Sequence, residues 1–333
     1  MPELLSGVLG NLWLGTPVWM WLAFLGIVFV LLAVDLGIVN REQHEIGVKE
    51  SLTLSAVYIS LGLAFGGWVW WQMGPEAGAA YVTGFVVEKS LAMDNVFVIA
   101  MIFSYFAIPR LYQHRVLFWG ILGVIVLRGI MIGVGAALVT EFSWVLYLFA
   151  AFLIFTGIKM WLSAEEDFSV GDSKLLRFFS RHLRVTDKLH GDRFWVRETD
   201  PKTGKAALFI TPLMLTLLMV EFADVIFAVD SVPAIFAITT DPFIVYTSNI
   251  FAVLGLRALY FALAALVHRF HYLKYALSVL LVFIGSKIFV ADLVDMPGGK
   301  FPPSISLAIT FAILAAGVGY SLWKTRNDQT LVD

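Results

Sequence analysis

Apolar runs about twenty residues long recur along the whole chain, with short polar stretches between them. A helix of about this length crosses the hydrocarbon layer of a bilayer. Only 14% of the 333 residues are charged, whereas soluble domains carry about 25%, and the mean hydropathy is +0.84. The sequence therefore predicts an all-α polytopic membrane protein.

The apolar runs predict about nine transmembrane helices. The third and the sixth are longer than a bilayer requires, so we expect them to tilt, break or extend beyond it. No lysine or arginine precedes the first run, so it lacks the basic start of a signal peptide and is expected to be a retained span. The predicted spans are Pro17–Val39, Leu52–Gln72, Ala80–Ile108, Val116–Thr140, Trp144–Leu162, Ala206–Thr239, Phe243–Val267, Leu273–Leu293 and Ser304–Trp323.

Lysine and arginine concentrate in alternate loops between these spans, whereas the opposite loops hold mainly acids. Basic loops stay in the cytoplasm, so the N-terminus is predicted outside and the C-terminus inside. The longest basic stretch, residues 163–205, contains a predicted amphipathic helix at Lys174–Leu183 and a plausible hairpin at Arg193–Ile210. This segment is interpreted as a cytoplasmic linker, with a regulatory or gating role as the alternative.

Two parts of the chain resemble each other in the same order of features. Tyr147–Lys159 aligns with Tyr275–Lys287, and further matches lie upstream. Each unit holds three helices, an odd number, so the second must cross the membrane in the opposite sense to the first. Inverted repeats are typical of secondary transporters, which bind their substrate near the midplane between the halves; duplication without transport stays open. The upstream matches are Arg128 with Arg257, Glu88 with Asp224, Asp94 with Asp230, and Asn95 with Ser231.

The repeat divides the chain into five parts. Residues 1–79 hold two spans, residues 80–162 form the first three-helix repeat, and residues 163–205 form the cytoplasmic segment. Residues 206–294 form the second repeat, and residues 295–333 hold the ninth span and a cytoplasmic tail.

Six acidic residues fall within the predicted spans and away from their ends, where each costs about 2.5–3.5 kcal/mol on insertion scales. Arginine or lysine partners, protons or bound cations must therefore neutralise them. Arg128 and Arg257 are expected to act as structural counter-ions for some of the acids, while the others form a site. The six are Asp35, Glu88, Asp94, Glu221, Asp224 and Asp230.

Spacing limits which groups can bind one ion together. Glu221 and Asp224 are three residues apart and share a helix face, whereas acids six residues apart are about 9 Å apart along a straight helix. Pro233 lacks an N–H, which frees the carbonyl of Val229 beside Asp230. This carbonyl is a candidate cation ligand. The alternative, which the sequence supports equally, is that Pro233 only kinks the helix.

The candidate ligands are all oxygen donors, which suit magnesium, calcium or manganese(II) rather than zinc or copper. All six histidines fall in or beside predicted inner loops, and the chain has no cysteine, which excludes disulfides and thiolate metal sites. No nucleophile–base arrangement is visible, so the protein is not expected to be an enzyme. No basic stripe suggests nucleic acid, and an oligomer is possible but not indicated.

The segments Glu88–Asn95, Glu221–Ser231 and Thr247–Arg257 resemble the TerC family, and especially its Alx-like branch, as do His182–Asp187 and the run ending at Glu198. The resemblance covers nearly the whole chain. It implies a bacterial inner-membrane protein linked to manganese export. The family's motif positions carry over as metal-ligand candidates onto Asp35, Glu88, Asp94, Asn95, Glu221, Asp224, Asp230 and Ser231.

Together with this resemblance, these features predict an exporter of divalent cations that prefers Mn²⁺, works by alternating access and exchanges the metal for protons. The expected partners are the lipid bilayer and the transported ion, with no permanently bound cofactor. Two alternatives remain. An older label of the Alx-like branch suggests a membrane-bound redox modulator, and the family's link to tellurite and alkali suggests a stress-response scaffold without transport.

Overall fold

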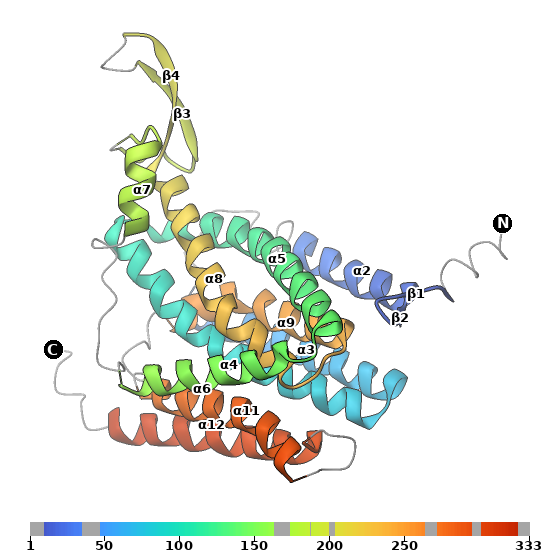
Figure 1. Cartoon of the computed structure of the whole chain (residues 1–333). Helices are drawn as coiled ribbons and strands as arrows, with labels where there is room; N and C mark the ends of the chain where they lie inside the picture. Colours follow the sequence, from blue (N-terminus) through green and yellow to red (C-terminus); the bar gives the residue numbers. More distant parts are fainter. Residues whose placement is uncertain are drawn as a thin grey trace, which may run out of the picture.

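The computed structural model describes residues 10–34, 47–162, 174–186, 188–199, 204–263, 272–294 and 301–325. Asp35 lies outside these ranges, and the side chains of Asp94 and Arg257 also lie outside the description. Most of the described residues are helical, and the helices pack side by side into one bundle (Figure 1). The protein is an all-α polytopic membrane protein.

Within the described ranges, six helices are long and apolar enough to cross a membrane: α3 (Val48–Met73), α5 (Arg110–Glu141), α6 (Val145–Leu162), α8 (Pro212–Phe236), α11 (Leu273–Leu293) and α12 (Pro303–Thr325). The same ranges contain two shorter apolar helices, α2 (Val18–Val34) and α9 (Pro242–Leu254). Helix α4 (Pro75–Tyr105) is 31 residues long but carries charged residues in its middle. The number of spans, the orientation and the division into five parts stay predictions.

The sixth predicted span begins later than the sequence suggested. Its first residues form strand β4 (Ala206–Ile210), which pairs antiparallel with β3 (Trp195–Thr199). The apolar residues of a half-buried strand had extended the apolar run of the helix. The Thr211 hydroxyl accepts a hydrogen bond from the Met214 N–H, and Pro212 takes the first helical position, so α8 begins there.

The seventh predicted span is a broken helix. Helix α9 ends at Leu254, Gly255 follows, and α10 (Leu256–Leu263) continues the chain. The buried Lys89 of α4 donates from Nζ to the carbonyl of Ala252 in the last turn of α9, at 3.0 Å. Helix ends inside a membrane need such partners because lipid offers none, and a cation suits the negative end of the helix dipole.

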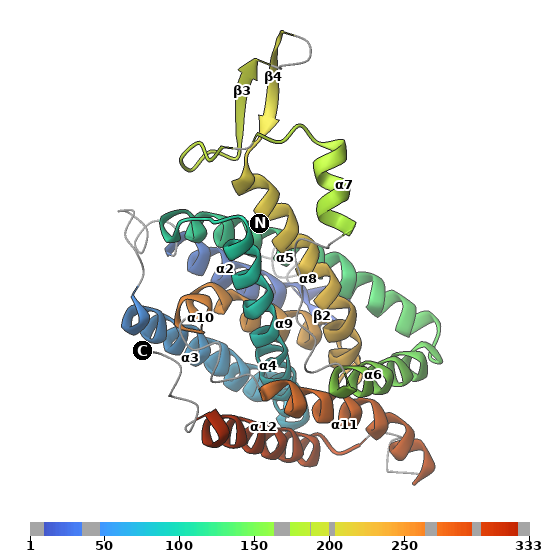
Figure 2. The same ribbon diagram turned by 90° about the vertical axis from the view of Figure 1, so that its left-hand side faces the viewer.

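The segment between the two predicted repeats projects from one end of the bundle (Figures 1 and 2). It contains α7 (Lys174–His182) and the β3–β4 hairpin, while a second small hairpin, β1 (Leu12–Trp13) with β2 (Thr16–Pro17), precedes α2. Arg115 of α5 forms an ion pair with Asp192 and lies 5.3 Å from the Phe194 ring centre. The Thr211 N–H donates to the Phe194 carbonyl at 2.9 Å. The hairpin is thus attached to both α5 and α8.

Helices α6 and α11 make a reciprocal contact. A side chain at Gly157 would meet Ser278 and Val282, whereas one at Gly285 would meet Ala150 and Ile154. In the alignment of Tyr147–Lys159 with Tyr275–Lys287, each of these pairs is the image of the other. Contacts in which equivalent residues exchange roles are what a two-fold axis produces. The packing therefore supports a pseudo-two-fold relation between the predicted repeats.

Replacing Gly285 by alanine is expected to lower the free energy of unfolding by about 1–3 kcal/mol, the usual cost of overpacking. The new Cβ would lie 2.6 Å from the Ala150 carbonyl oxygen, a backbone atom that cannot turn aside. Gly319→Ala in α12 is the control, since a Cβ there meets nothing within 4 Å. Unfolding in mixed detergent micelles measures both. Equal stabilities for the two variants would contradict this packing.

Candidate cation site

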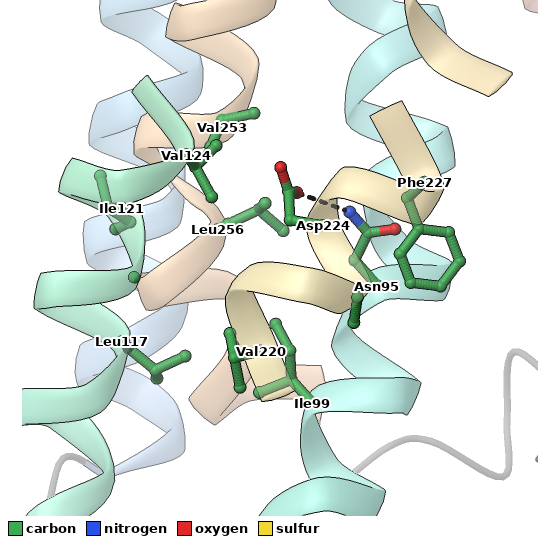
Figure 3. A pocket seen from close by; sticks show the side chains of 12 residues that line it. Asn95, Ile99, Leu117, Ile121, Val124, Val220, Asp224, Phe227, Val253 and Leu256 are labelled. Atoms are coloured by element: carbon green, nitrogen blue, oxygen red, sulfur yellow. Dashed lines mark hydrogen bonds between the residues drawn. The ribbon is translucent and has the colours of Figure 1, made fainter. Parts of the chain in front are cut away.

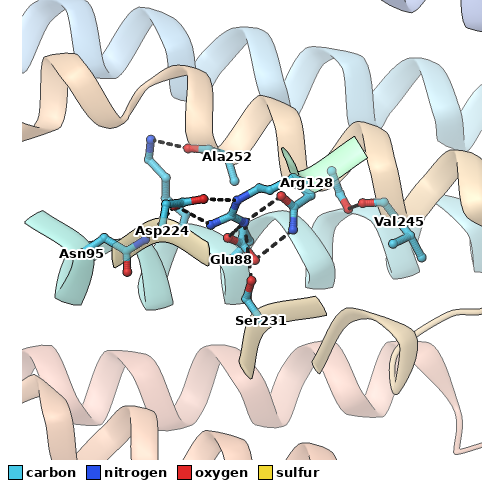
Figure 4. A network of polar contacts seen from close by, with 10 residues as sticks. Glu88, Asn95, Arg128, Asp224, Ser231, Val245 and Ala252 are labelled. Carbon is cyan, nitrogen blue, oxygen red and sulfur yellow. Dashed lines mark hydrogen bonds and ion pairs between the residues drawn. The ribbon is translucent and has the colours of Figure 1, made fainter. Parts of the chain in front are cut away.

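A buried arginine lies at the centre of the bundle. Arg128 of α5 is 1% exposed, and its guanidinium donates to both carboxylate oxygens of Asp224, from Nε at 3.2 Å and from the second terminal nitrogen at 3.1 Å. Its other terminal nitrogen forms an ion pair with Glu88 (Figure 4). One arginine therefore joins an acid of the first predicted repeat, on α4, to the matching acid of the second, on α8.

Two neutral side chains complete this arrangement. The Asn249 side-chain oxygen accepts from Arg128 at 2.7 Å, and its amide nitrogen donates to Glu88 at 3.1 Å. The Ser231 hydroxyl lies 3.4 Å from the same arginine nitrogen. Sequence reasoning missed Asn249, although an asparagine inside an apolar span is the kind of polar residue that marks a site.

The charges of this group are nearly balanced. Glu88 and Asp224 contribute two negative charges, and Arg128 contributes one positive charge that it keeps at any relevant pH. Lys89, 8% exposed, brings a second positive charge on the adjacent position of α4. Buried carboxylates without partners would be very costly in this environment. The described structure thus shows both acids paired with one arginine of the protein itself.

A cavity of about 30 Å³ lies beside Asp224 (Figure 3), which is enough for one water or a small ion. Asn95 lines it and donates to Asp224 at 3.3 Å, while its side-chain oxygen is buried without a hydrogen-bond partner. The rest of the lining is apolar except for Asp224. An unpartnered buried acceptor beside a carboxylate favours a positively charged or hydrogen-bond-donating occupant.

Glu221 lies near this cavity. It precedes Asp224 by three residues on α8, and its neighbours Val220 and Ala223 line the cavity. Its carboxyl lies against Gly123 of α5, where any side chain would collide with it, and its Oε2 is buried without a hydrogen-bond partner. The cavity region therefore holds two unpartnered oxygen acceptors in addition to Asp224.

The other predicted ligands are divided. Asp230 interacts with Thr156 and Lys159 of α6. Pro233 lies three residues before the end of α8, so the carbonyl of Val229 lacks its helical partner only in the last turns of that helix. Among the described residues, no three histidine or acidic side chains come together in a way that could hold a metal ion. Asp35 and the side chains of Asp94 and Arg257 lie outside what the structure describes.

Comparison with known proteins finds one matching family and several similar membrane proteins. The integral membrane protein TerC family matches residues 73–329. The uncharacterized membrane protein STKORF319 of Myxococcus xanthus is 46% identical over 93% of this chain and 94% of its own length. Alx of Escherichia coli strain K12, whose name proposes a membrane-bound redox modulator, is 46% identical over 95% of this chain and 98% of its own. No solved structure matches the chain.

The match spans most of the chain and includes every residue of the Arg128 group and of the adjacent cavity. The Alx relatives are similar over nearly their full length, so the whole architecture is shared with them rather than one motif. The chain belongs to the integral membrane protein TerC family.

Proposed function

We propose that this protein exports divalent cations, with a preference for Mn²⁺, through a site formed by Asp224, Asn95 and Glu221. The observation that carries the proposal is the water-sized cavity that Asp224 and Asn95 line, together with the nearby Glu221, because Asn95 Oδ1 and Glu221 Oε2 are both buried without hydrogen-bond partners. Burying such acceptors costs about 1–3 kcal/mol each if they stay unpaired. A cation that binds all three groups would remove that cost.

The donor set favours a hard cation. Carboxylate and amide oxygens bind magnesium, calcium and manganese(II), while zinc and copper prefer nitrogen or sulfur ligands. The resemblance to the TerC family, which is linked to manganese export, favours Mn²⁺ among the hard cations. Water or backbone carbonyls would supply the remaining ligands, as is usual for ions with six or more oxygen ligands.

Transport follows from the predicted inverted repeat. Cytoplasmic metal enters between the repeats, displaces Arg128 from Asp224 and displaces a proton from Glu221, because metal binding requires deprotonated ligands. Rocking of one repeat against the other then opens the site to the outside. The reciprocal contact between α6 and α11 at Gly157 and Gly285 supports such a motion, since it joins the repeats along a surface that equivalent residues share.

The experiment measures Mn²⁺ uptake into inside-out vesicles with a metal-sensitive dye. Wild type is expected to accumulate Mn²⁺, and Asp224→Asn to lose this activity, because the substitution removes the charge beside the cavity. Asp292→Asn is the control, since Asp292 is exposed on α11 and bonded to Tyr147. Equal Mn²⁺ uptake by wild type and Asp224→Asn would contradict the proposal.

The name carried by the Alx relatives offers redox modulation as a second function. This chain has no cysteine, so it cannot exchange electrons through thiols, and a redox role would need a bound cofactor. Purified protein with a visible absorption band would favour that function. A scaffold function would instead depend on the projecting hairpin, and removing residues 195–210 would abolish it while leaving Mn²⁺ flux largely intact.

A further inference from the structure

The two central carboxylates are held by a cation that belongs to the protein. Arg128 engages Asp224 through two nitrogens and Glu88 through a third, so it occupies the position between the repeats where an ion would bridge them. A guanidinium cannot lose its proton in a protein, so this neutralisation does not depend on pH. Without Arg128, an empty site would expose two buried negative charges to a medium of low dielectric.

We propose that Arg128 is a tethered counter-ion that allows the empty carrier to return after it has released its cargo. The proposal rests on the proposed transport function. The incoming metal binds Asp224 and replaces Arg128 there, while Arg128 keeps its ion pair with Glu88. When the metal leaves, Arg128 binds Asp224 again, and the empty site moves back through the membrane with one net negative charge on these three groups instead of the two that it would carry without the arginine.

The contacts explain why Arg128 releases Asp224 rather than Glu88 when the metal binds. Asp224 lies beside the cavity, and its Oδ1 is shared between Arg128 and Asn95. Glu88 is fixed on both sides, because Asn249 bonds the Glu88 carboxylate and the arginine nitrogen that contacts it. The hold on Glu88 can therefore persist while the arginine swings away from Asp224.

The charges balance in the loaded state of this scheme. A divalent ion with Asp224 and Glu221 is neutral, and so is Arg128 with Glu88. In the empty state Arg128 covers both central acids. Arg128 therefore lowers the uncompensated buried charge of the empty carrier from two to one, and each such charge costs several kcal/mol even after relaxation.

The scheme separates two kinds of transport. Exchange of Mn²⁺ for Mn²⁺ needs only the loaded carrier to move, whereas net export also needs the empty carrier to return. Proteoliposomes that contain unlabelled Mn²⁺ measure exchange by the entry of labelled Mn²⁺, and a metal-sensitive dye in metal-free proteoliposomes measures net flux. Arg128→Gln is expected to keep exchange and to lose net flux by about tenfold or more, since a return barrier raised by about 1.4 kcal/mol gives that factor.

A double variant tests whether a loss of net flux in Arg128→Gln is caused by misfolding. Arg128→Gln combined with Glu88→Gln removes one positive and one negative charge and leaves Asp224 for the metal. It is expected to behave like Arg128→Gln in both assays and to bind Mn²⁺ more tightly than wild type, because no arginine competes. Arg128→Lys keeps the charge and is expected to restore part of the net flux.

Arg115→Gln is the matched control on the same helix, since Arg115 pairs with Asp192 at the surface, and it should leave both fluxes unchanged. The inference fails if the double variant folds and either loses exchange together with net flux or retains both. Wild type without exchange or net flux would instead refute the proposed transport function. Tighter Mn²⁺ binding by the double variant, measured by calorimetry, checks the competition independently of transport.

Discussion

Arg128→Met is expected to lower the free energy of unfolding by about 3–5 kcal/mol, because it leaves buried carboxylates without their partner. The arginine is 1% exposed and bonds acids on two different helices, so no solvent can replace it. Adding Asp224→Asn to the variant should recover part of the loss by removing one of the unpaired charges. Unfolding titrations in mixed micelles, done without divalent cations, measure the complete cycle.

Arg115→Met provides the scale for this prediction. Arg115 also forms an ion pair from α5, but its side chain and that of Asp192 are 38% and 39% exposed. Exposed pairs contribute about 0–1 kcal/mol, so this variant should be much closer to wild type. Similar losses for Arg115→Met and Arg128→Met would mean that burial does not govern the role of Arg128.

Gly120→Ala is expected to make the protein more stable and nearly inactive in transport. Gly120 of α5 lines the cavity beside Asp224, and a Cβ there would meet Val220 at 3.7 Å, an ordinary contact. Alanine stabilises a helix interior by roughly 0.5–1 kcal/mol relative to glycine. The added methyl group would however fill much of a 30 Å³ cavity. Mn²⁺ flux should therefore fall about tenfold or more, which corresponds to about 1.4 kcal/mol of lost binding.

Gly133→Ala on the same helix is the matched control, because a Cβ there meets nothing within 4 Å. Both variants should gain similar stability in the unfolding assay, and only Gly120→Ala should lose Mn²⁺ flux in vesicles. Normal flux through Gly120→Ala would show that the ion does not pass this cavity, and the site would then have to be sought elsewhere.

The sequence predicted the helices best where apolar length alone defines them. The predicted eighth span, Leu273–Leu293, coincides with α11. The sixth was wrong at its start, because the apolar residues of β4 continue directly into α8 and only Thr211 separates them. The break at Gly255 was also missed, since α9 and α10 are both apolar and glycine is common in membrane helices.

The acids could be predicted as a group but not assigned individually. Sequence spacing indicated that Glu88 and Asp224 are equivalent, and the structure brings both to Arg128. Whether a buried acid holds an arginine or faces a cavity depends on helix rotation and tilt, which six-residue spacing does not define. Asp230 shows this, because it shares α8 with Asp224 yet lies near Lys159 on a different helix.

The projecting hairpin has a mechanical consequence. Only Thr211 separates β4 from α8, the helix that carries Glu221, Asp224 and Asp230, and Arg115 connects the hairpin to α5, the helix that carries Arg128. A small tilt of either helix would therefore move the hairpin by a larger distance, because the hairpin projects from the end of the bundle. The chain has no cysteine, so spectroscopic probes can be attached without background labelling to cysteines introduced at exposed Leu208 and at exposed Trp71 of α3. The distance between the two probes would then report that tilt.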